Sequence, residues 1–187
     1  MADFATYCDL CAAREADDLD RIYHDTRYGF PVEDDNELFA LLILEINQAG
    51  LSWRTILNKE SNFRKAFDGF DISTVAAYGE SDRTRLLADA GIIRNRLKVD
   101  AAIHNAKAVL GLQREHGSFK AWLDAHHPLD KQDWVKLFKT RFKFVGGEIV
   151  GEFLMSSGYL RGAHAESCPV HRKILKAGPP WATIPRG

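Results

Sequence analysis

The sequence predicts an all-α protein, and three observations lead to this prediction. Apolar residues recur at helical spacing along nearly the whole chain, no segment shows the sustained apolar and polar alternation of a strand, and capping residues precede the apolar runs. The chain has 187 residues, 45% of them hydrophobic, which is enough for a sizeable buried core. We therefore expect residues 1–187 to form one domain of two helical lobes with a pocket between them.

Eight to ten mostly short helices are expected along the chain. Acidic and capping residues at 34–37 start a helix that ends at Ala49-Gly50, and Ser52 can cap the next helix. A long helix should follow the turn at residues 91–96. The tail after Gly178 should be irregular. Further helix starts or breaks are expected at Asp71, Ser81, Ser118, Asp130, Gly146-Gly147 and Pro169.

The charge of the chain is unevenly distributed. Residues 1–90 carry 9 Lys and Arg against 18 Asp and Glu, whereas residues 91–187 carry 16 against 8. Such a chain can present a basic face to phosphates, or its two halves can simply attract each other. The longest apolar run, Leu38–Leu44, is too short to cross a membrane, and the first residues lack a secretory signal. We therefore expect a cytoplasmic protein with no membrane partner.

A carboxylate lies inside the most apolar predicted helix. Residues 38–48 read LFALLILEINQ, which is apolar nearly all the way round apart from Glu45. A buried carboxylate must be protonated, paired with a cation or directed into a polar cavity. A structural ion pair with an arginine is one explanation. The amides, the glycine turn and Trp53 that follow Glu45 favour the other explanation, a functional pocket.

Two tyrosines flank a His–Asp pair in the segment YHDTRYGFP at residues 23–31. The rings of Tyr23 and Tyr28 can stack on a flat ligand, and their hydroxyls can donate hydrogen bonds. Routine core packing explains either tyrosine when it is considered alone, so that this segment supports a pocket only together with Glu45.

Cysteine and histidine residues gather near both ends of the sequence. Cys8, Cys11 and His24 come first, and His164, Cys168 and His171 lie near the other end, with His164 and Cys168 four residues apart. Zinc prefers four nitrogen or sulfur ligands in a tetrahedron, so that a pair from each end would close a structural site. The spacing matches no compact zinc finger, and the residues alone leave the choice of ligands open.

A helix–hairpin–helix motif is predicted at residues 86–98, LLADAGIIRNRLK. The turn at Gly91 and Ile92 offers backbone N–H groups, and the following helix begins with Arg94, Arg96 and Lys98, so that all of them can bind one phosphate. A helical hairpin with a solvated basic face explains this pattern equally well.

Four segments of the chain resemble the bacterial 3-methyladenine DNA glycosylase I family: YHDTRYGFP, LEINQAGLSW, DAGIIRNRLKVDAAIHNAKA and FKFVGGEIVGEFLMSSG. They occur in the family's order, and the match runs from about Cys11 to Cys168. The resemblance implies an all-helical helix–hairpin–helix DNA glycosylase fold in which a structural zinc ion joins the N- and C-termini. It also implies hydrolysis of the N-glycosidic bond of N3-methyladenine in alkylated double-stranded DNA, which leaves an abasic site.

The resemblance also assigns roles to individual residues. Glu45 falls on the family's base-pocket glutamate, Tyr23 on its pocket tyrosine and Trp53 on its stacking tryptophan, with Tyr28 expected beside them. The family's first cysteine precedes its first zinc-binding histidine by thirteen residues, which selects Cys11 over Cys8. The implied zinc ligands are Cys11, His24, His164 and Cys168, and the expected DNA contacts are Gly50, Leu51, Gly91, Ile92, Arg94 and Arg96.

The chain departs from the family at three positions. Tyr28 and Ala13 stand where tryptophan is usual, and Asn47 stands where glutamine or an aromatic residue is more usual. A divergent member that excises another base and a DNA-binding module without catalysis are therefore the alternatives. A pure binding module has no use for a carboxylate in an apolar helix, so that Glu45 favours a glycosylase. No catalytic lysine is evident at the pocket motifs, which predicts a monofunctional enzyme without lyase activity. We also expect the protein to be a monomer.

Overall fold

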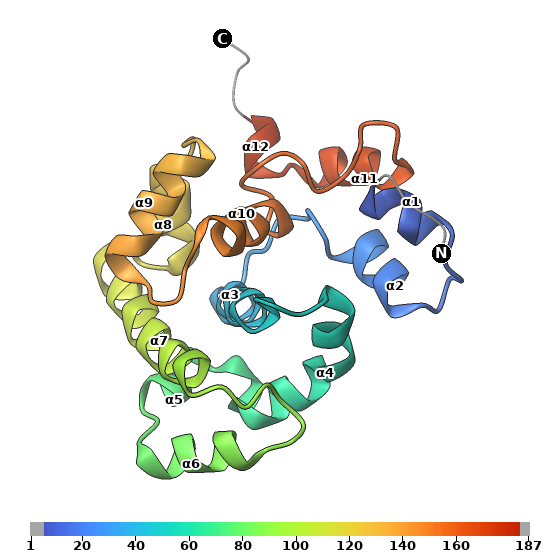
Figure 1. The fold of residues 1–187 in the computed structure, drawn as a ribbon. Helices are drawn as coiled ribbons and strands as arrows, with labels where there is room; N and C mark the ends of the chain where they lie inside the picture. The colour runs from blue at the N-terminus through green and yellow to red at the C-terminus, as the bar shows by residue number, and fades with distance from the viewer. Residues whose placement is uncertain (1–5, 184–187) are drawn as a thin grey trace.

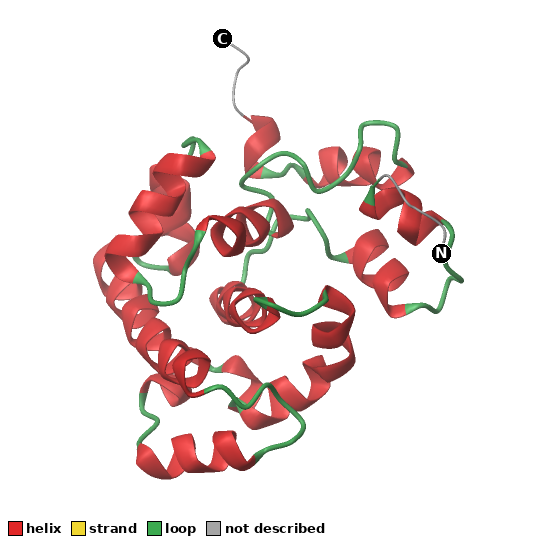
Figure 2. Ribbon diagram, in the orientation of Figure 1, coloured by secondary structure: helices red, strands yellow, loops and turns green. Residues whose placement is uncertain are grey.

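The computed structural model describes residues 6–183, which fold into helices joined by loops and contain no strand (Figure 2). The all-α prediction is therefore confirmed for this part of the chain. None of its helices is both long and apolar enough to cross a bilayer. In chain order the elements are α1 (Tyr7–Ala12), α2 (Leu19–Thr26), α3 (Asp35–Gln48), α4 (Trp53–Ala66), the 3-10 helix η1 (Asp68–Phe70), α5 (Ile72–Ala76), α6 (Glu80–Ala88), α7 (Arg96–His116), α8 (Phe119–His126), α9 (Lys131–Arg141), α10 (Gly147–Ser156), α11 (Pro169–Ala177) and α12 (Pro180–Thr183).

Helix α3 is the centre of the fold, with α4, α7, α8 and α10 packed around it (Figure 1). Its residues 38–47 are all buried, as expected for a helix that is apolar nearly all the way round. The helix begins at Asp34, whose side chain accepts a hydrogen bond from the N–H of Glu37. The main hydrophobic core forms around it and extends along the chain from Leu38 to Tyr159.

The predicted helix starts are largely correct. Ser52, Asp71, Ser118 and Asp130 each cap a helix through a side-chain oxygen that accepts a backbone N–H. The start expected at Ser81 is wrong by two residues: α6 is capped by Gly79, whose N–H donates to the carboxylate of Asp82, 3.0 Å away.

The tail was expected to be irregular, but Pro180–Thr183 forms the short helix α12. Burial of Trp181 explains the difference, since this side chain packs into a second, smaller core with Cys168, Val170 and Ile174. Residues 184–187 of the expected tail lie outside the described residues.

The second core joins the two end regions of the chain. Cys8 of α1 and Phe30 pack against the C-terminal residues of this core, and α1 lies beside α11 (Figure 1). Gly29 makes the contact close: its φ is +82°, and a Cβ at this position would lie 2.7 Å from the Cβ of Ala163. The loop after α2 therefore fits directly against the loop that leads into α11.

Candidate active site and metal centre

A cavity of about 460 Å³ opens beside the N-terminal part of the fold. It contains all four residues that were predicted to form a base pocket, and they come from α2, the loop after it, α3 and α4. Its size suits a single flat ring system with some solvent. The lining residues are Tyr7, Tyr23, Tyr28, Glu45, Gln48, Trp53, Glu148 and Glu152.

Glu45 is a buried carboxyl group without a cationic partner. Its side chain is 3% exposed, and it accepts a hydrogen bond from the hydroxyl of Ser156, 3.4 Å from Oε1. No lysine, arginine or histidine lies within ion-pair distance of it among residues 6–183, so that the structural ion pair is not the explanation. Burial raises the pKa of Glu45 to about 8, and the nearby carboxylate of Glu152 adds to the rise.

Aromatic rings form the walls around this carboxyl group. The ring of Tyr23 lies 5.1 Å from that of Trp53 and 5.7 Å from that of Tyr28, measured between centroids. The hydroxyl of Tyr23 donates to Ser156, which links it to Glu45. A flat cation is attracted to such a site for two reasons. The acidic group attracts its positive charge, and the faces of the aromatic rings stack on it.

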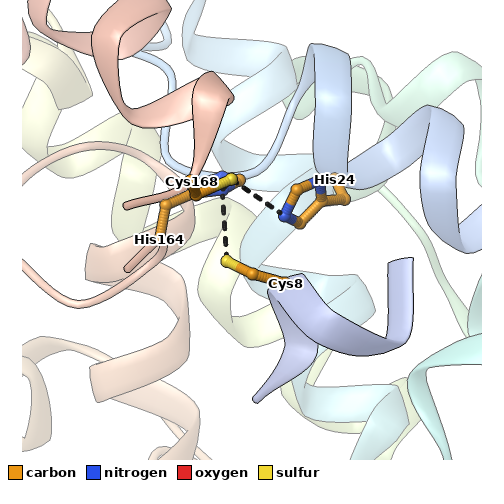
Figure 3. Close-up of side chains that lie close together, drawn as sticks. All are labelled: Cys8, His24, His164 and Cys168. Atoms are coloured by element: carbon orange, nitrogen blue, oxygen red, sulfur yellow. Dashed lines mark hydrogen bonds between the residues drawn. The ribbon is translucent and has the colours of Figure 1, made fainter. Parts of the chain in front are cut away.

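Four side chains that could hold a metal ion lie close together where the two end regions of the chain meet (Figure 3). One ligand atom each from Cys8, His24, His164 and Cys168 lies within 4.8 Å of all the others. The Sγ of Cys168 is 3.8 Å from Nε2 of His24 and 3.6 Å from Nδ1 of His164. A zinc tetrahedron with bonds of about 2.0–2.3 Å has edges of roughly 3.3–3.8 Å, so that these separations fit zinc.

Second-sphere hydrogen bonds leave the correct ring nitrogens free for a metal. The Nδ1 of His24 lies 2.7 Å from the carboxylate of Asp25, and the Nε2 of His164 lies 2.8 Å from the carbonyl of Tyr28. When these nitrogens carry the protons, Nε2 of His24 and Nδ1 of His164 are free to bind. Burial lowers the pKa of His164 to about 4, which favours the neutral ring that coordinates metal.

The structure replaces one predicted ligand. Cys8, and not Cys11, faces the two histidines: its Sγ is 3.8 Å from Nδ1 of His164. Cys11 is fully buried, and its Sγ is directed at the carbonyl oxygen of Asp20, 3.6 Å away. Residues three positions apart on a helix differ in direction by about 60°, so that the rotation of α1 decides which thiol reaches the site.

The turn after α3 presents two of the predicted DNA contacts. Gly50 has a φ of +84° and open space where a side chain would be, and Leu51 is 40% exposed. Hydrogen bonds in both directions between Gln48 and Leu51 close this turn. An exposed leucine on a rigid turn beside the pocket is well placed to contact a distorted duplex.

The predicted hairpin is present between α6 and α7, but only some of its side chains and N–H groups are free to bind a phosphate. Arg94 and Arg96 are exposed, whereas Ile92 is buried. The N–H groups of Gly91 and Ile92 already donate to the side chain and the carbonyl of Asp89, so that they are not free for a phosphate. Among the described residues, the N–H of Arg94 has no such partner.

Lys98 is not a phosphate contact, contrary to the expectation from the sequence. Its side chain is buried, and its Nζ donates to the carbonyls of Asn47 at 2.9 Å and Ala49 at 2.8 Å. These carbonyls are left unpaired where α3 ends. Lys98 therefore caps α3 and fixes the turn that carries Leu51.

Comparisons with known proteins give the family. A sequence profile described as methyladenine glycosylase matches residues 13–136. The chain is 37% identical over 177 residues to DNA-3-methyladenine glycosylase 1 of Escherichia coli strain K12, covering 84% of this chain and 94% of that protein. A solved structure of 3-methyladenine DNA glycosylase I from Staphylococcus aureus is similar with a TM-score of 0.76 and 31% identity, covering 88% of this chain and 97% of that one. The chain belongs to the methyladenine glycosylase family.

Four pocket residues of this methyladenine glycosylase family member were missed in the sequence, namely Tyr7, Gln48, Glu148 and Glu152. Tyr7 comes from α1, and its ring lies 5.7 Å from that of Tyr28 at an angle of 87°. Gln48 is one turn after Glu45 on α3, and Glu152 lies on α10. The positions of Gln48 and Glu152 follow from helical spacing, since Glu152 is one turn before Ser156, but no local pattern marks Tyr7.

Proposed function

We propose that this protein is a DNA glycosylase that hydrolyses the N-glycosidic bond of N3-methyladenine in alkylated double-stranded DNA and leaves an abasic site. The observation that carries this proposal is Glu45, a buried carboxyl group in an aromatic pocket of a methyladenine glycosylase family member, with no cationic partner in the described part of the chain. The relatives from Escherichia coli and Haemophilus influenzae are both named as DNA-3-methyladenine glycosylases.

The pocket recognises a base that has left the helical stack. A glycosylase must rotate its target nucleotide out of the duplex to reach the bond it breaks. Methylation at N3 makes adenine cationic, and the rings of Tyr23, Tyr28 and Trp53 bind such a cation with about 0.5–2 kcal/mol each. The positive charge also lowers the pKa of Glu45 from its raised value, so that the bound base is held by a carboxylate.

Hydrolysis needs little acid catalysis, because the methylated base carries the charge that weakens its bond to the sugar. Glu45 contributes by hydrogen bonding to the base and by favouring positive charge next to it. The cavity is lined by tyrosine, tryptophan, glutamine and glutamate, with no lysine to form an imine with the sugar. A water molecule is therefore the nucleophile, and the enzyme is monofunctional.

The metal that we propose for the Cys8, His24, His164 and Cys168 cluster is zinc, in a structural role. Two thiolates and two imidazoles complete its tetrahedron and leave no open position for water, so that the ion would stabilise the fold and take no part in hydrolysis. The chain acts as a cytoplasmic monomer on DNA, with the turn of Gly50 and Leu51 and the hairpin arginines Arg94 and Arg96 contacting the duplex.

Released bases from methylated DNA test this function directly. Wild-type protein should release N3-methyladenine, detected by chromatography with mass spectrometry, and strands should break at the resulting sites only after alkali treatment. Glu45→Gln should keep its affinity for DNA and lose at least about 100-fold of the excision rate. Release of a different base by the wild type would favour the divergent glycosylase, and DNA binding with no release would favour a binding module.

A further inference from the structure

A second carboxylate lies in the pocket and has no part in the mechanism above. Glu152 is on α10, one helical turn before Ser156, so that both side chains are on the same face of α10, and Glu152 lines the cavity. Ser156 donates to Glu45, and the hydroxyl of Tyr28 donates to Oε2 of Glu152 over 3.2 Å. Each of these two acidic groups is thus held by a hydroxyl donor.

Among residues 6–183, no basic side chain forms an ion pair with Glu152. The lining residues include three carboxylates, at 45, 148 and 152, and no lysine, arginine or histidine. Glu148 is paired with Lys131 at 3.3 Å, but no described residue forms an ion pair with Glu152. Burial is the largest influence on the pKa of Glu152 and raises it, and the charge of Glu148 adds to the rise, whereas the hydrogen bond from Tyr28 and the charge of Lys131 lower it in part.

Tyr28 fixes the position of this carboxylate. Its backbone carbonyl is bound by His164 of the metal cluster, and its ring packs on those of Tyr7 and Tyr23. Its hydroxyl donates to Oε2 of Glu152 over 3.2 Å, which sets the direction of the carboxylate. Glu152 is therefore oriented by a residue that the surrounding structure holds rigidly.

We propose that Glu152, oriented by Tyr28, is a specificity-determining residue that makes the pocket select a positively charged base over a neutral base of the same shape. This inference rests on the proposed glycosylase function and adds a second anionic contact to that of Glu45. The pocket disfavours the simultaneous ionisation of Glu45 and Glu152, and a cation between the aromatic rings stabilises both carboxylates. A neutral base gives no such stabilisation.

Recognition of the charge of a ligand can be distinguished from recognition of its shape by measuring the binding of two free ligands. The cation 3,9-dimethyladeninium carries a fixed positive charge, and 3,9-dimethyl-3-deazaadenine is its neutral isostere, with carbon in place of the methylated nitrogen. Calorimetric titration should give a wild-type preference for the cation. Glu152→Gln should weaken cation binding by about tenfold and change binding of the neutral isostere by less than about twofold.

Two further variants complete the design. Tyr28→Phe keeps the carboxylate but removes the hydrogen bond that orients it, and should weaken cation binding by a smaller factor. Glu33→Gln removes the same charge from an exposed side chain outside the cavity and should leave both affinities unchanged. Melting curves check that each variant is folded.

Equal losses for both ligands in Glu152→Gln would mean that Glu152 only supports the pocket wall, and would overturn the inference. So would an unchanged preference for the cation, or a wild-type protein that binds neither ligand. Base release from methylated DNA by the wild type is a separate measurement. A protein that releases no base but shows the predicted change in ligand preference would refute the proposed function and leave the charge selectivity in place.

Discussion

The Nε2 of His164 lies 2.8 Å from the carbonyl oxygen of Tyr28, so that a side chain of the metal cluster holds a wall residue of the pocket. The bond connects two sites that the sequence presents as unrelated. It has a direct chemical reason, because donation from Nε2 leaves Nδ1 free for the metal. Loss of the metal should therefore disturb Tyr28 as well as the ends of the chain.

The first prediction identifies the ligand from α1. Elemental analysis should find one zinc per wild-type chain, with marked loss in Cys8→Ser and Cys168→Ser, because both thiols belong to the cluster. Cys11→Ser is the matched control on the same helix and should keep its zinc, since the Cys11 thiol faces the carbonyl of Asp20. Zinc loss in Cys11→Ser with full retention in Cys8→Ser would restore the assignment made from the spacing.

The second prediction concerns the stability of Glu45→Gln. The pKa of Glu45 is raised from 4.5 to about 8, so that the folded state prefers the protonated group. Wild type should therefore lose stability relative to Glu45→Gln as the pH rises from 4.5 to 8, and the difference should then level off. We expect the variant to be more stable by at least about 1 kcal/mol at the upper end, or roughly 2–4 °C in Tm.

Thermal melts of both proteins across this pH range measure the difference. Equal melting temperatures at every pH would show that the Glu45 carboxyl group is solvated in the folded protein. A wild type that gains stability with rising pH relative to the variant would mean that a cation compensates the carboxylate.

The third prediction concerns the hairpin. Replacing Arg94 and Arg96 together by Ala should weaken binding to all duplex sequences alike and flatten its salt dependence, by about 0.9 in slope for each phosphate that is no longer neutralised. A double variant of Arg172 and Lys173, two exposed cations on α11, removes the same charge elsewhere and serves as the control. If the hairpin variant keeps the wild-type slope, the duplex binds to another face, such as the one formed by the exposed cations Lys136, Lys139, Arg141 and Lys143 on and directly after α9.

The fourth prediction tests Lys98 as a cap. Lys98→Met keeps the length of the side chain but leaves the carbonyls of Asn47 and Ala49 without their donor, at a cost of about 1–3 kcal/mol. Chemical unfolding should show this loss, whereas Lys107→Met, an exposed change on the same helix, should be close to neutral. A stable Lys98→Met protein would show that solvent replaces the lysine at the end of α3.

Patterns that depend on a single helix could be predicted well from the sequence. The position of Glu45 within an apolar helix already required a special environment, and the capping roles of Ser52 and Asp130 follow from local chemistry. Contacts between distant segments could not be predicted in this way. The choice between Cys8 and Cys11 depends on how α1 is rotated against α11, which residue spacing does not encode.

The roles of Lys98 and Glu152 also depend on contacts between distant segments and could not be predicted from the sequence. In the sequence, Lys98 is one of three cations after a glycine turn, and only the packing of α7 against the end of α3 buries it. Glu152 is an ordinary acidic residue of an amphipathic helix until the fold brings it to Tyr28, 124 positions away. Its role comes from that pairing, for which the chain carries no local signal.

The metal cluster can form only late in the synthesis of this chain. Cys8 and His24 leave the ribosome early, but the cluster cannot close until His164 and Cys168 have followed them. The hydrogen bond to the carbonyl of Tyr28 forms only with His164, so that this support of the pocket wall is missing until residue 164 has been added. Chains whose translation stops before residue 164 therefore lack the contact that holds Tyr28, and a completed pocket requires that His164 has been synthesised.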